Sequence, residues 1–183
     1  VYWTLKSVGF ESLAILNGGS MTWGTQNTAA EGHAQIDMAL DHGINFIDTA
    51  EMYPTTPLSK ETQGDTERII GDWVAASGRR SDVIIATKVC GEGYMHVRDG
   101  ALISPATIRA ALEASLTSLK TDYIDLYQLH WPDRNANFFG KLGYQVKEDE
   151  DATSLEESLS ALKELVDAGK VRAVGLSNET PWG

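Results

Sequence analysis

Residues 44–53 read INFIDTAEMY, and this stretch decides how the rest of the chain is interpreted. A short apolar run ends on Asp48, and Tyr53 follows five residues later. Burying an ionised carboxylate without a partner is costly, so an aspartate at the tip of a buried strand needs a cation or hydrogen-bond donors nearby. We therefore expect another part of the chain to place a positive charge beside Asp48.

The same order of helix, turn and short apolar strand recurs along the chain. Strands that are almost wholly apolar are typical of a parallel sheet buried on both faces. Five such strands alternating with four helices predict an α/β fold with βα architecture, in a single domain over residues 1–183. The expected helices begin at Thr28 (with Glu31), Asp65, Ser104 (with Pro105) and Ser154 (with Glu157), and the expected strands lie at 13–16, 44–48, 83–88, 123–130 and 171–177.

Apolar stripes indicate which face of each helix packs on the sheet. In the last helix, the spacing places Leu155, Leu159, Leu162 and Val166 on one face, which we expect to be buried. The long connections follow strands, at 49–64, 89–104 and 131–153, whereas the turns from helix to strand are short. In βα barrels the face after the strands carries the chemistry.

Three chemically active side chains stand at the ends of neighbouring strands. If these strands are adjacent, Asp48, Lys88 and His130 reach the same rim, with Tyr53 in the loop after Asp48. Lys88 would then be the cation that Asp48 requires, and its charge should lower the pKa of the Tyr53 phenol. His130 could hydrogen-bond a substrate oxygen beside the phenol. The set predicts a proton donor facing a developing oxyanion.

Composition excludes several other classes of protein. The formal net charge of −11 argues against a nucleic-acid surface, and no run approaches the roughly 18 apolar residues of a membrane span. The N-terminal residues lack a signal-peptide pattern, so the cytoplasm is the expected compartment. Cys90 is the single cysteine and cannot form an internal disulfide. A zinc site from Cys90, His96 and His130 lacks ligand spacing, so no metal is expected.

Four motifs, INFIDTAEMY, IIATKV, DLYQLHWP and VGLSN, resemble the strand ends of aldo-keto reductases, and AEMYP, ETQG, FGKLGY and GLSNETPWG look like the Tas-like branch of that superfamily. The resemblance implies a (β/α)₈ TIM-barrel fold, NADP(H) as cofactor and small-molecule aldehydes or ketones as substrates. It implies that Tyr53 is the general acid, that Lys88 and Asp48 tune it, and that His130 positions the carbonyl. The residues implied at the cofactor are Met21, Thr22, Trp23, Asp48, Ser177 and Asn178, and those implied at the substrate are Trp23 and Trp131.

The roles of some individual residues have more than one interpretation at this point. Asn178 could instead cap a following helix. Trp131, together with Phe138, Phe139 and Tyr144 after the same strand, is expected to form a substrate wall rather than a loop anchor. Two other functions compete with carbonyl reduction: a catalytically weak or silent folded module, and a βα-barrel lyase that uses Lys88 as a Schiff base.

Two features depart from the family pattern. The first strand end reads LNGGSMTWG, with Asn17 and Gly18 where small and apolar residues are expected, and glycines weaken a strand. The sequence stops at Gly183, after the fifth strand, so it predicts a barrel truncated to about five strands and four helices. The inward residues of such a sheet would lack a facing layer. Three explanations are open: a fragment of a longer gene, an association of chains that completes the core, or an altered function. For a chain that folds in isolation we expect the second, a homo-oligomer, most simply a homodimer.

Overall fold

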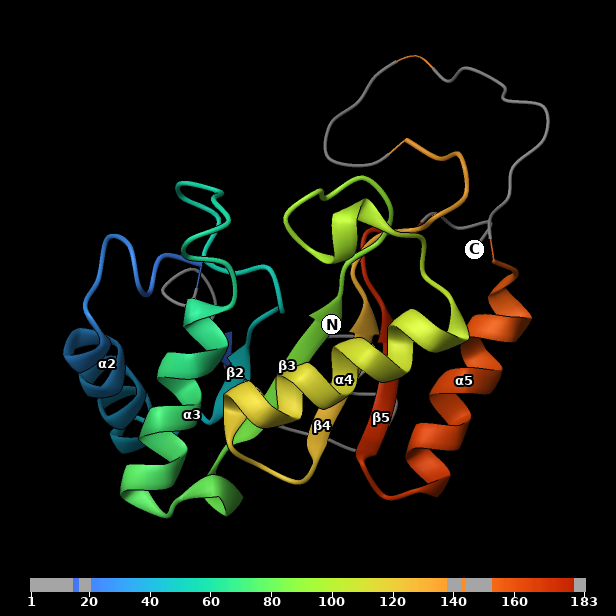
Figure 1. The fold of residues 1–183 in the computed structure, drawn as a ribbon. Helices are drawn as coiled ribbons and strands as arrows, with labels where there is room; N and C mark the ends of the chain where they lie inside the picture. Colours follow the sequence, from blue (N-terminus) through green and yellow to red (C-terminus); the bar gives the residue numbers. More distant parts are fainter. Residues whose placement is uncertain (1–14, 17–20, 138–142, 144–152, 180–183) are drawn as a thin grey trace.

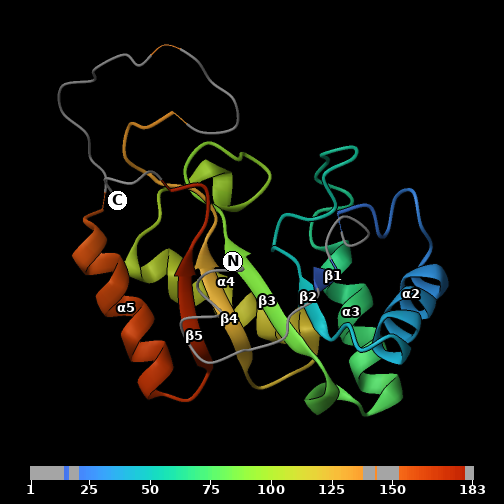
Figure 2. The ribbon, with the colours of Figure 1, turned by 180° about the vertical axis from the view of Figure 1, so that it is seen from behind.

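The computed structural model describes residues 15–16, 21–137, 143 and 153–179. Its strands form one parallel sheet in the order β1-β2-β3-β4-β5, and strands alternate with helices along the chain (Figures 1 and 2). The elements are β1 (Ile15–Leu16), α2 (Ala29–Asp41), β2 (Phe46–Asp48), α3 (Asp65–Ser77), η1 (Arg80–Asp82), β3 (Ile84–Val89), η2 (Arg98–Gly100), α4 (Pro105–Leu119), β4 (Ile124–Leu129), α5 (Leu155–Asp167) and β5 (Val171–Leu176).

This is the predicted arrangement of five strands and four α-helices within the described residues, and it forms part of a βα barrel. Helices α2 to α5 cover one face of the sheet in Figure 1, and Figure 2 shows the strands from the opposite side. The first strand is confined to two described residues, because 13 and 14 lie outside the described part, as do Asn17 and Gly18.

Local capping explains where most helices begin. Thr28 accepts from the Glu31 amide, and the Glu31 carboxylate accepts from the Thr28 amide, which is the predicted capping box. Ser104 caps α4 with Pro105 in the first turn, and Ser154 accepts from the Glu157 amide at the start of α5.

The prediction for α3 was wrong in one detail. Asp65 is the first helical residue rather than the cap, and Gly64 occupies the cap position with a φ of 80°. Glycine suits this position because a left-handed conformation carries no Cβ penalty there. At the other end, Gly78 stops the helix in the same left-handed conformation.

The main core lies between the sheet and its helices. Alternate strand residues such as Ile47, Ile85 and Tyr127 point to this side and pack against the apolar faces of α3 and α4. In α5 the expected stripe is only partly correct. The buried face consists of Ser158, Ala161, Leu162 and Leu165, and Leu155 and Leu159 are exposed.

The opposite face of the sheet carries a second apolar cluster. Ala86 and Leu126 are register partners on β3 and β4, Phe46 of β2 packs with them, and each of the three is fully buried. The expectation that these inward residues would be left exposed is therefore wrong for this cluster. Exposure is instead found on β5, where residues 173–176 are only partly buried.

A charged and aromatic cluster joins three strands at the end opposite the predicted site. The guanidinium carbons of Arg80 and Arg172 lie 3.9 and 4.1 Å from the Tyr123 ring centroid. Each arginine also pairs with a different oxygen of Asp125, at 2.7 and 2.8 Å. Asp125 accepts from the Ile85 amide as well, so this cluster links β3, β4 and β5 at their N-terminal ends.

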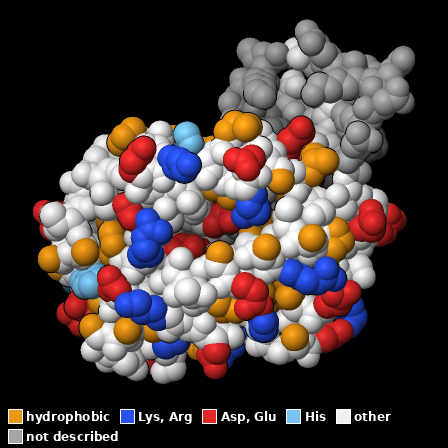
Figure 3. Space-filling view, viewed as in Figure 1, with side chains coloured by type: hydrophobic (Ala, Val, Ile, Leu, Met, Phe, Trp, Pro, Cys, Tyr) orange, Lys and Arg blue, Asp and Glu red, His pale blue; other side chains and the backbone are white. Residues whose placement is uncertain are grey.

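Acidic and basic side chains are interspersed on the helix-covered face in Figure 3. No helix in the described ranges has both the length and the apolar character needed to cross a bilayer.

Candidate active site

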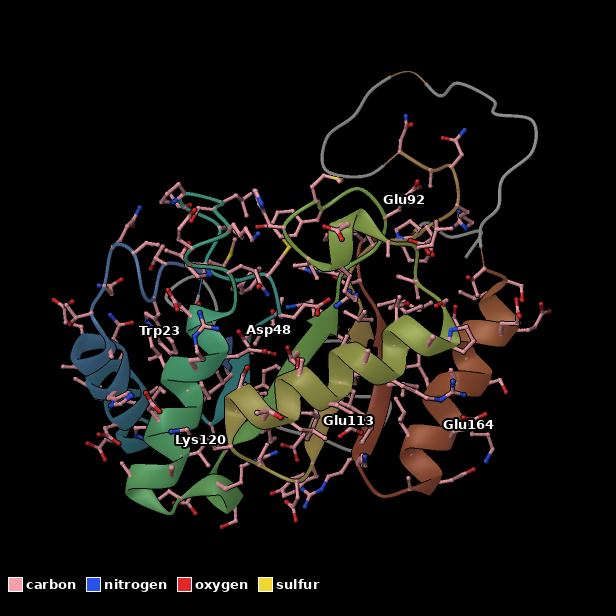
Figure 4. All side chains as sticks on the ribbon, viewed as in Figure 1. Trp23, Asp48, Glu92, Glu113, Lys120 and Glu164 are labelled. Atoms are coloured by element: carbon pink, nitrogen blue, oxygen red, sulfur yellow. The ribbon has the colours of Figure 1, made fainter. Side chains whose placement is uncertain are left out.

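The predicted cation for Asp48 is present. Asp48 ends β2, and Lys88 lies one residue before the end of the neighbouring β3. The Lys88 Nζ donates to Asp48 Oδ2 at 2.9 Å and to the Thr49 carbonyl oxygen at 2.7 Å. Both side chains are almost fully buried, and Asp48 lies at the centre of Figure 4. The register of the parallel strands thus brings together an acid and a base that are far apart in sequence.

Tyr53 and His130 complete the cluster at the same rim. The Tyr53 ring contacts the His130 ring edge-on, with 5.9 Å between centroids, and the Lys88 Nζ lies 5.2 Å from the Tyr53 centroid. His130 follows β4, and its amide donates to the carbonyl oxygen of Val89 at the end of β3. The four predicted residues therefore converge from three consecutive strand ends.

The phenol of Tyr53 has a different acidity from the one expected. Its pKa is raised to about 12, first by burial and then by the negative charge of Asp48. We expected Lys88 to lower this pKa. The lysine charge is largely neutralised by Asp48, and burial lowers the pKa of Lys88 itself. Tyr53 is thus a phenol that keeps its proton at neutral pH.

His130 is held in its neutral form. Burial, and after it the charge of Lys88, lowers the pKa of this imidazole to about 3. A neutral imidazole has one N–H donor and one acceptor nitrogen, so it can donate a hydrogen bond to a carbonyl oxygen without carrying charge.

A pocket of about 410 Å³ opens above these residues. Tyr53, His130 and Trp131 contribute to its wall, so Trp131 is placed where the sequence predicted a substrate contact. Phe138, Phe139 and Tyr144 lie outside the described residues. Met21, which the resemblance placed at the cofactor, also lines the pocket, and the wall residues that the sequence did not identify are Met52, Thr55, Leu58, Glu92, Gly93 and Tyr94. Their positions in long connections after strands were the available signal.

Ser177 and Asn178 lie at the end of β5, next to His130. Asn178 has a left-handed φ of 54°, and its Nδ2 donates to the His130 carbonyl oxygen at 2.8 Å and to Ser177 Oγ at 3.1 Å. The asparagine therefore braces the chain around His130, a role that the sequence did not indicate. Ser177 is partly exposed and Asn178 is exposed, so both remain accessible at the rim.

The three residues of the first loop that were expected beside the cofactor have three different environments. Met21 is partly buried against the pocket residues, and Thr22 Oγ1 donates to Asn27 Oδ1 at 2.9 Å. Trp23, which was expected beside cofactor and substrate, has its side chain fully buried between α2 and α3, outside the residues that line the pocket (Figure 4). Its Nε1 donates to Gln35 Oε1, and its ring packs beside Gly32.

A buried ion pair beneath the pocket was missed by the sequence interpretation. Glu51, two residues before Tyr53, pairs with Arg98 in the connection after β3. The only hint in the sequence is an acidic residue inside an otherwise apolar segment. Within the described ranges, no group of three His, Cys, Asp or Glu residues could hold a metal ion.

Comparisons with known proteins agree with this geometry. The sequence model of the Aldo/keto reductase family matches residues 15–183. Protein tas of Escherichia coli K12 is 48% identical over 174 residues, which is 93% of this chain and 50% of tas. Aldo-keto reductase YhdN of Bacillus subtilis is 37% identical over 177 residues, covering 93% of this chain and 43% of YhdN.

Among solved structures, the thermostable aldo-keto reductase Tm1743, crystallised with the inhibitor epalrestat, superposes with a TM-score of 0.61. It is 30% identical, and the match covers 88% of this chain and 48% of that one. The chain thus spans about half the length of the curated relatives that it matches.

Proposed function

This chain belongs to the aldo/keto reductase family, and from that premise we propose that it takes part in the NADPH-dependent reduction of aldehydes and ketones to alcohols. The observation that carries the proposal is the convergence of Asp48, Lys88, Tyr53 and His130 at one rim of the sheet, where Tyr53 and His130 line a pocket. Tyr53 is the general acid in this proposal, and Trp131 forms part of the wall that holds the substrate body.

The two groups that would face the carbonyl oxygen are neutral donors. Tyr53 retains its proton at physiological pH, and an alkoxide that forms on the substrate is a strong enough base to take it. His130 can donate a second hydrogen bond to the same oxygen. As the phenolate develops, the nearby ammonium of Lys88 stabilises it, and Asp48 keeps that ammonium in place. The lysine would therefore act on the product of proton transfer rather than on the resting phenol.

The residues at the end of β5 fit a nicotinamide group. Gly175 presents no side chain, and a Cβ there would approach Gln128 Cγ to 3.3 Å, so a larger residue at this position would crowd the side chains of the neighbouring β4. Ser177 and Asn178 follow at the rim and offer a hydroxyl and an amide to a carboxamide. Met21 and Thr22 would contact the cofactor from the opposite side. When bound, the reduced nicotinamide would supply the hydride.

The proposal is tested most directly by Tyr53→Phe. This variant removes only the donated proton, so it should abolish reduction of 4-nitrobenzaldehyde and leave the dissociation constant for NADPH nearly unchanged. Tyr123→Phe, at the opposite end of the sheet, is the matched control and should keep full activity. Retained turnover in Tyr53→Phe would overturn the role of Tyr53.

Cofactor binding distinguishes the enzyme from the rival interpretation. Quenching of tryptophan fluorescence by micromolar NADPH supports a reductase, whereas no quenching at millimolar NADPH supports a silent folded module. Titration with NADH in parallel tests our proposal that NADP(H) is the preferred form.

We also propose a single domain that self-associates in the cytoplasm. Within the described residues β5 pairs only with β4, and residues 173–176 are partly exposed along that edge. An uncovered strand edge readily pairs with another strand. A second copy of the chain is the occupant that we propose, most simply in a two-fold dimer. Sedimentation equilibrium at low micromolar concentration tests this, and a monodisperse species of about 20 kDa would contradict it.

A further inference from the structure

One buried carboxylate ties the loop that carries Tyr53 to the end of β3 and to the connection after it. Glu51 Oε1 accepts from the Cys90 amide at 2.6 Å and from Arg98 Nη2 at 2.7 Å, and Oε2 accepts from Arg98 Nη1 at 2.5 Å. The Glu51 side chain is 6% exposed and that of Arg98 is 23% exposed. This fork-to-fork geometry uses both carboxylate oxygens and defines the relative orientation of the two side chains.

The main chain of Glu51 is held as firmly as its side chain. Its amide donates to the Lys88 carbonyl oxygen at 3.3 Å, and its carbonyl oxygen accepts from Gln63 Nε2 at 2.6 Å. The Tyr53 amide donates to the Ala50 carbonyl oxygen, which closes a tight turn around Glu51. Glu51 thus connects the Tyr53 turn directly to the end of β3, where Lys88 lies.

Arg98 reaches the Glu51 carboxylate from a backbone segment in an uncommon, left-handed conformation. Arg98 and Asp99 have φ values of 48° and 53°, and Gly100 follows at 73°, so three consecutive residues are left-handed. A non-glycine residue in the left-handed region is energetically unfavourable. Such a conformation persists where surrounding contacts hold the backbone in it. The same connection contributes Tyr94 to the pocket, and Tyr94 packs against the cluster that contains Met52 and Tyr53.

A role in stability alone does not account for this pair. Burying two charges costs desolvation energy, and apolar residues of the same volume commonly stabilise a protein as well or better. What a bidentate ion pair provides in addition is a fixed geometry. That geometry here joins the loop of the proton donor to the strand of Lys88 and to one wall of the pocket.

We propose that the Glu51–Arg98 pair is a positioning device that sets Tyr53 against Lys88 and His130 and links this alignment to the pocket wall formed by the connection after β3. The inference rests on the proposed reductase function. It concerns residues that act through Tyr53 and do not touch the substrate.

The single cysteine provides a local probe. Cys90 is 2% exposed, and its amide is bound by Glu51, so its thiol can react only when the end of β3 opens. Arg98→Met should raise the rate at which DTNB labels Cys90 under native conditions by about tenfold or more. Arg98→Lys keeps the positive charge but cannot form the bidentate pair with Glu51. Its Cys90 labelling rate should lie between those of wild type and Arg98→Met.

Catalysis and the environment of Tyr53 provide the functional readouts. For 4-nitrobenzaldehyde, kcat should fall about tenfold or more in Arg98→Met, with KM and the NADPH dissociation constant changing by about twofold at most. In protein labelled with ¹³C-tyrosine, the Tyr53 ring resonance, assigned with Tyr53→Phe, should shift in Arg98→Met and Glu51→Gln. Arg79→Met removes an exposed arginine paired with Asp82 and should leave all of these quantities unchanged.

The outcomes separate this inference from the proposed function. If the wild-type chain lacks reductase activity, the reductase proposal fails, and the Tyr53 resonance and Cys90 labelling still test the positioning role. The positioning role is overturned if Arg98→Lys keeps wild-type kcat, Tyr53 resonance and Cys90 labelling rate. It is equally overturned if Arg98→Met loses only global stability, with an unchanged Tyr53 resonance and kcat per folded molecule.

Discussion

Replacing Glu67 by glutamine should remove a pH-dependent loss of stability from the protein. Glu67 lies on α3 and faces β3, where Thr87 Oγ1 donates to its Oε1 at 2.6 Å. The side chain is buried, and within the described residues it forms no ion pair with a cation. Burial raises the pKa of this carboxyl from 4.5 to about 7, although the hydrogen bond from Thr87 opposes the rise.

The direction of the effect follows from proton binding. Between pH 4.5 and about 7 the unfolded chain has released this proton and the folded chain still holds it, so unfolding releases a proton. The stabilisation is complete below pH 4.5 and is lost as the pH rises to about 7. Each pKa unit is worth about 1.4 kcal/mol, so the full loss is about 3 kcal/mol. Glutamine stays neutral, and its side chain can still hydrogen-bond the buried hydroxyls of Thr87 and Ser115, which lie beside the Glu67 carboxyl.

Urea unfolding at several pH values between 4.5 and 8 measures this difference. The free energy of unfolding of Glu67→Gln minus that of wild type should increase by about 3 kcal/mol across this range. Titration of other groups, including His130, is common to both proteins and cancels in the difference. Glu156→Gln, which changes an exposed glutamate on α5, is the matched control. A difference that stays constant with pH would refute the assignment of a neutral buried Glu67 in the folded protein.

Three further outcomes follow from the same contacts. Lys88→Met leaves the Asp48 carboxylate buried without its cation and should lower the free energy of unfolding by about 3 kcal/mol; adding Asp48→Asn should recover part of this loss in urea unfolding. The imidazole resonances of His130 should not titrate between pH 5 and 8, because its pKa is about 3; a midpoint near 6.5 by NMR would contradict its neutral burial. Gly71→Ala should destabilise the protein by about 3 kcal/mol or more, measured by thermal unfolding, because a Cβ there overlaps the Ser118 carbonyl oxygen of α4.

The strand and helix pattern could be predicted because local signals and the tertiary fold agree. Thr28 and Ser104 are strong caps, and the apolar strands match a sheet buried on both faces. The start of α3 was misassigned because Asp65 is a good cap by type, whereas Gly64 can adopt the left-handed conformation that the preceding turn requires. Local propensity does not indicate which of two adjacent suitable residues the loop will select.

The meeting of Asp48 and Lys88 could be predicted because parallel strands align their ends. The environments of side chains beyond the strand ends could not be predicted in this way. Trp23 lies in the loop after the first strand, but its indole turns into the gap between α2 and α3, a direction that depends on the space beside Gly32. The pKa of Tyr53 likewise depends on how far Asp48 neutralises Lys88 and on the depth of burial. Both are properties of the packed molecule.

The stacking of Tyr123 between Arg80 and Arg172 has a consequence for how this protein could change over evolution or by design. This cluster fastens β3, β4 and β5 at the end of the sheet remote from the pocket, and Asp125 anchors both arginines there. The connections that shape the pocket leave from the other end of the same strands. Loop lengths and sequences around the pocket can therefore be exchanged while the strand alignment is kept by contacts that the pocket loops do not make. The chain offers a scaffold in which new specificities can be grafted at one end and stability selected independently at the other.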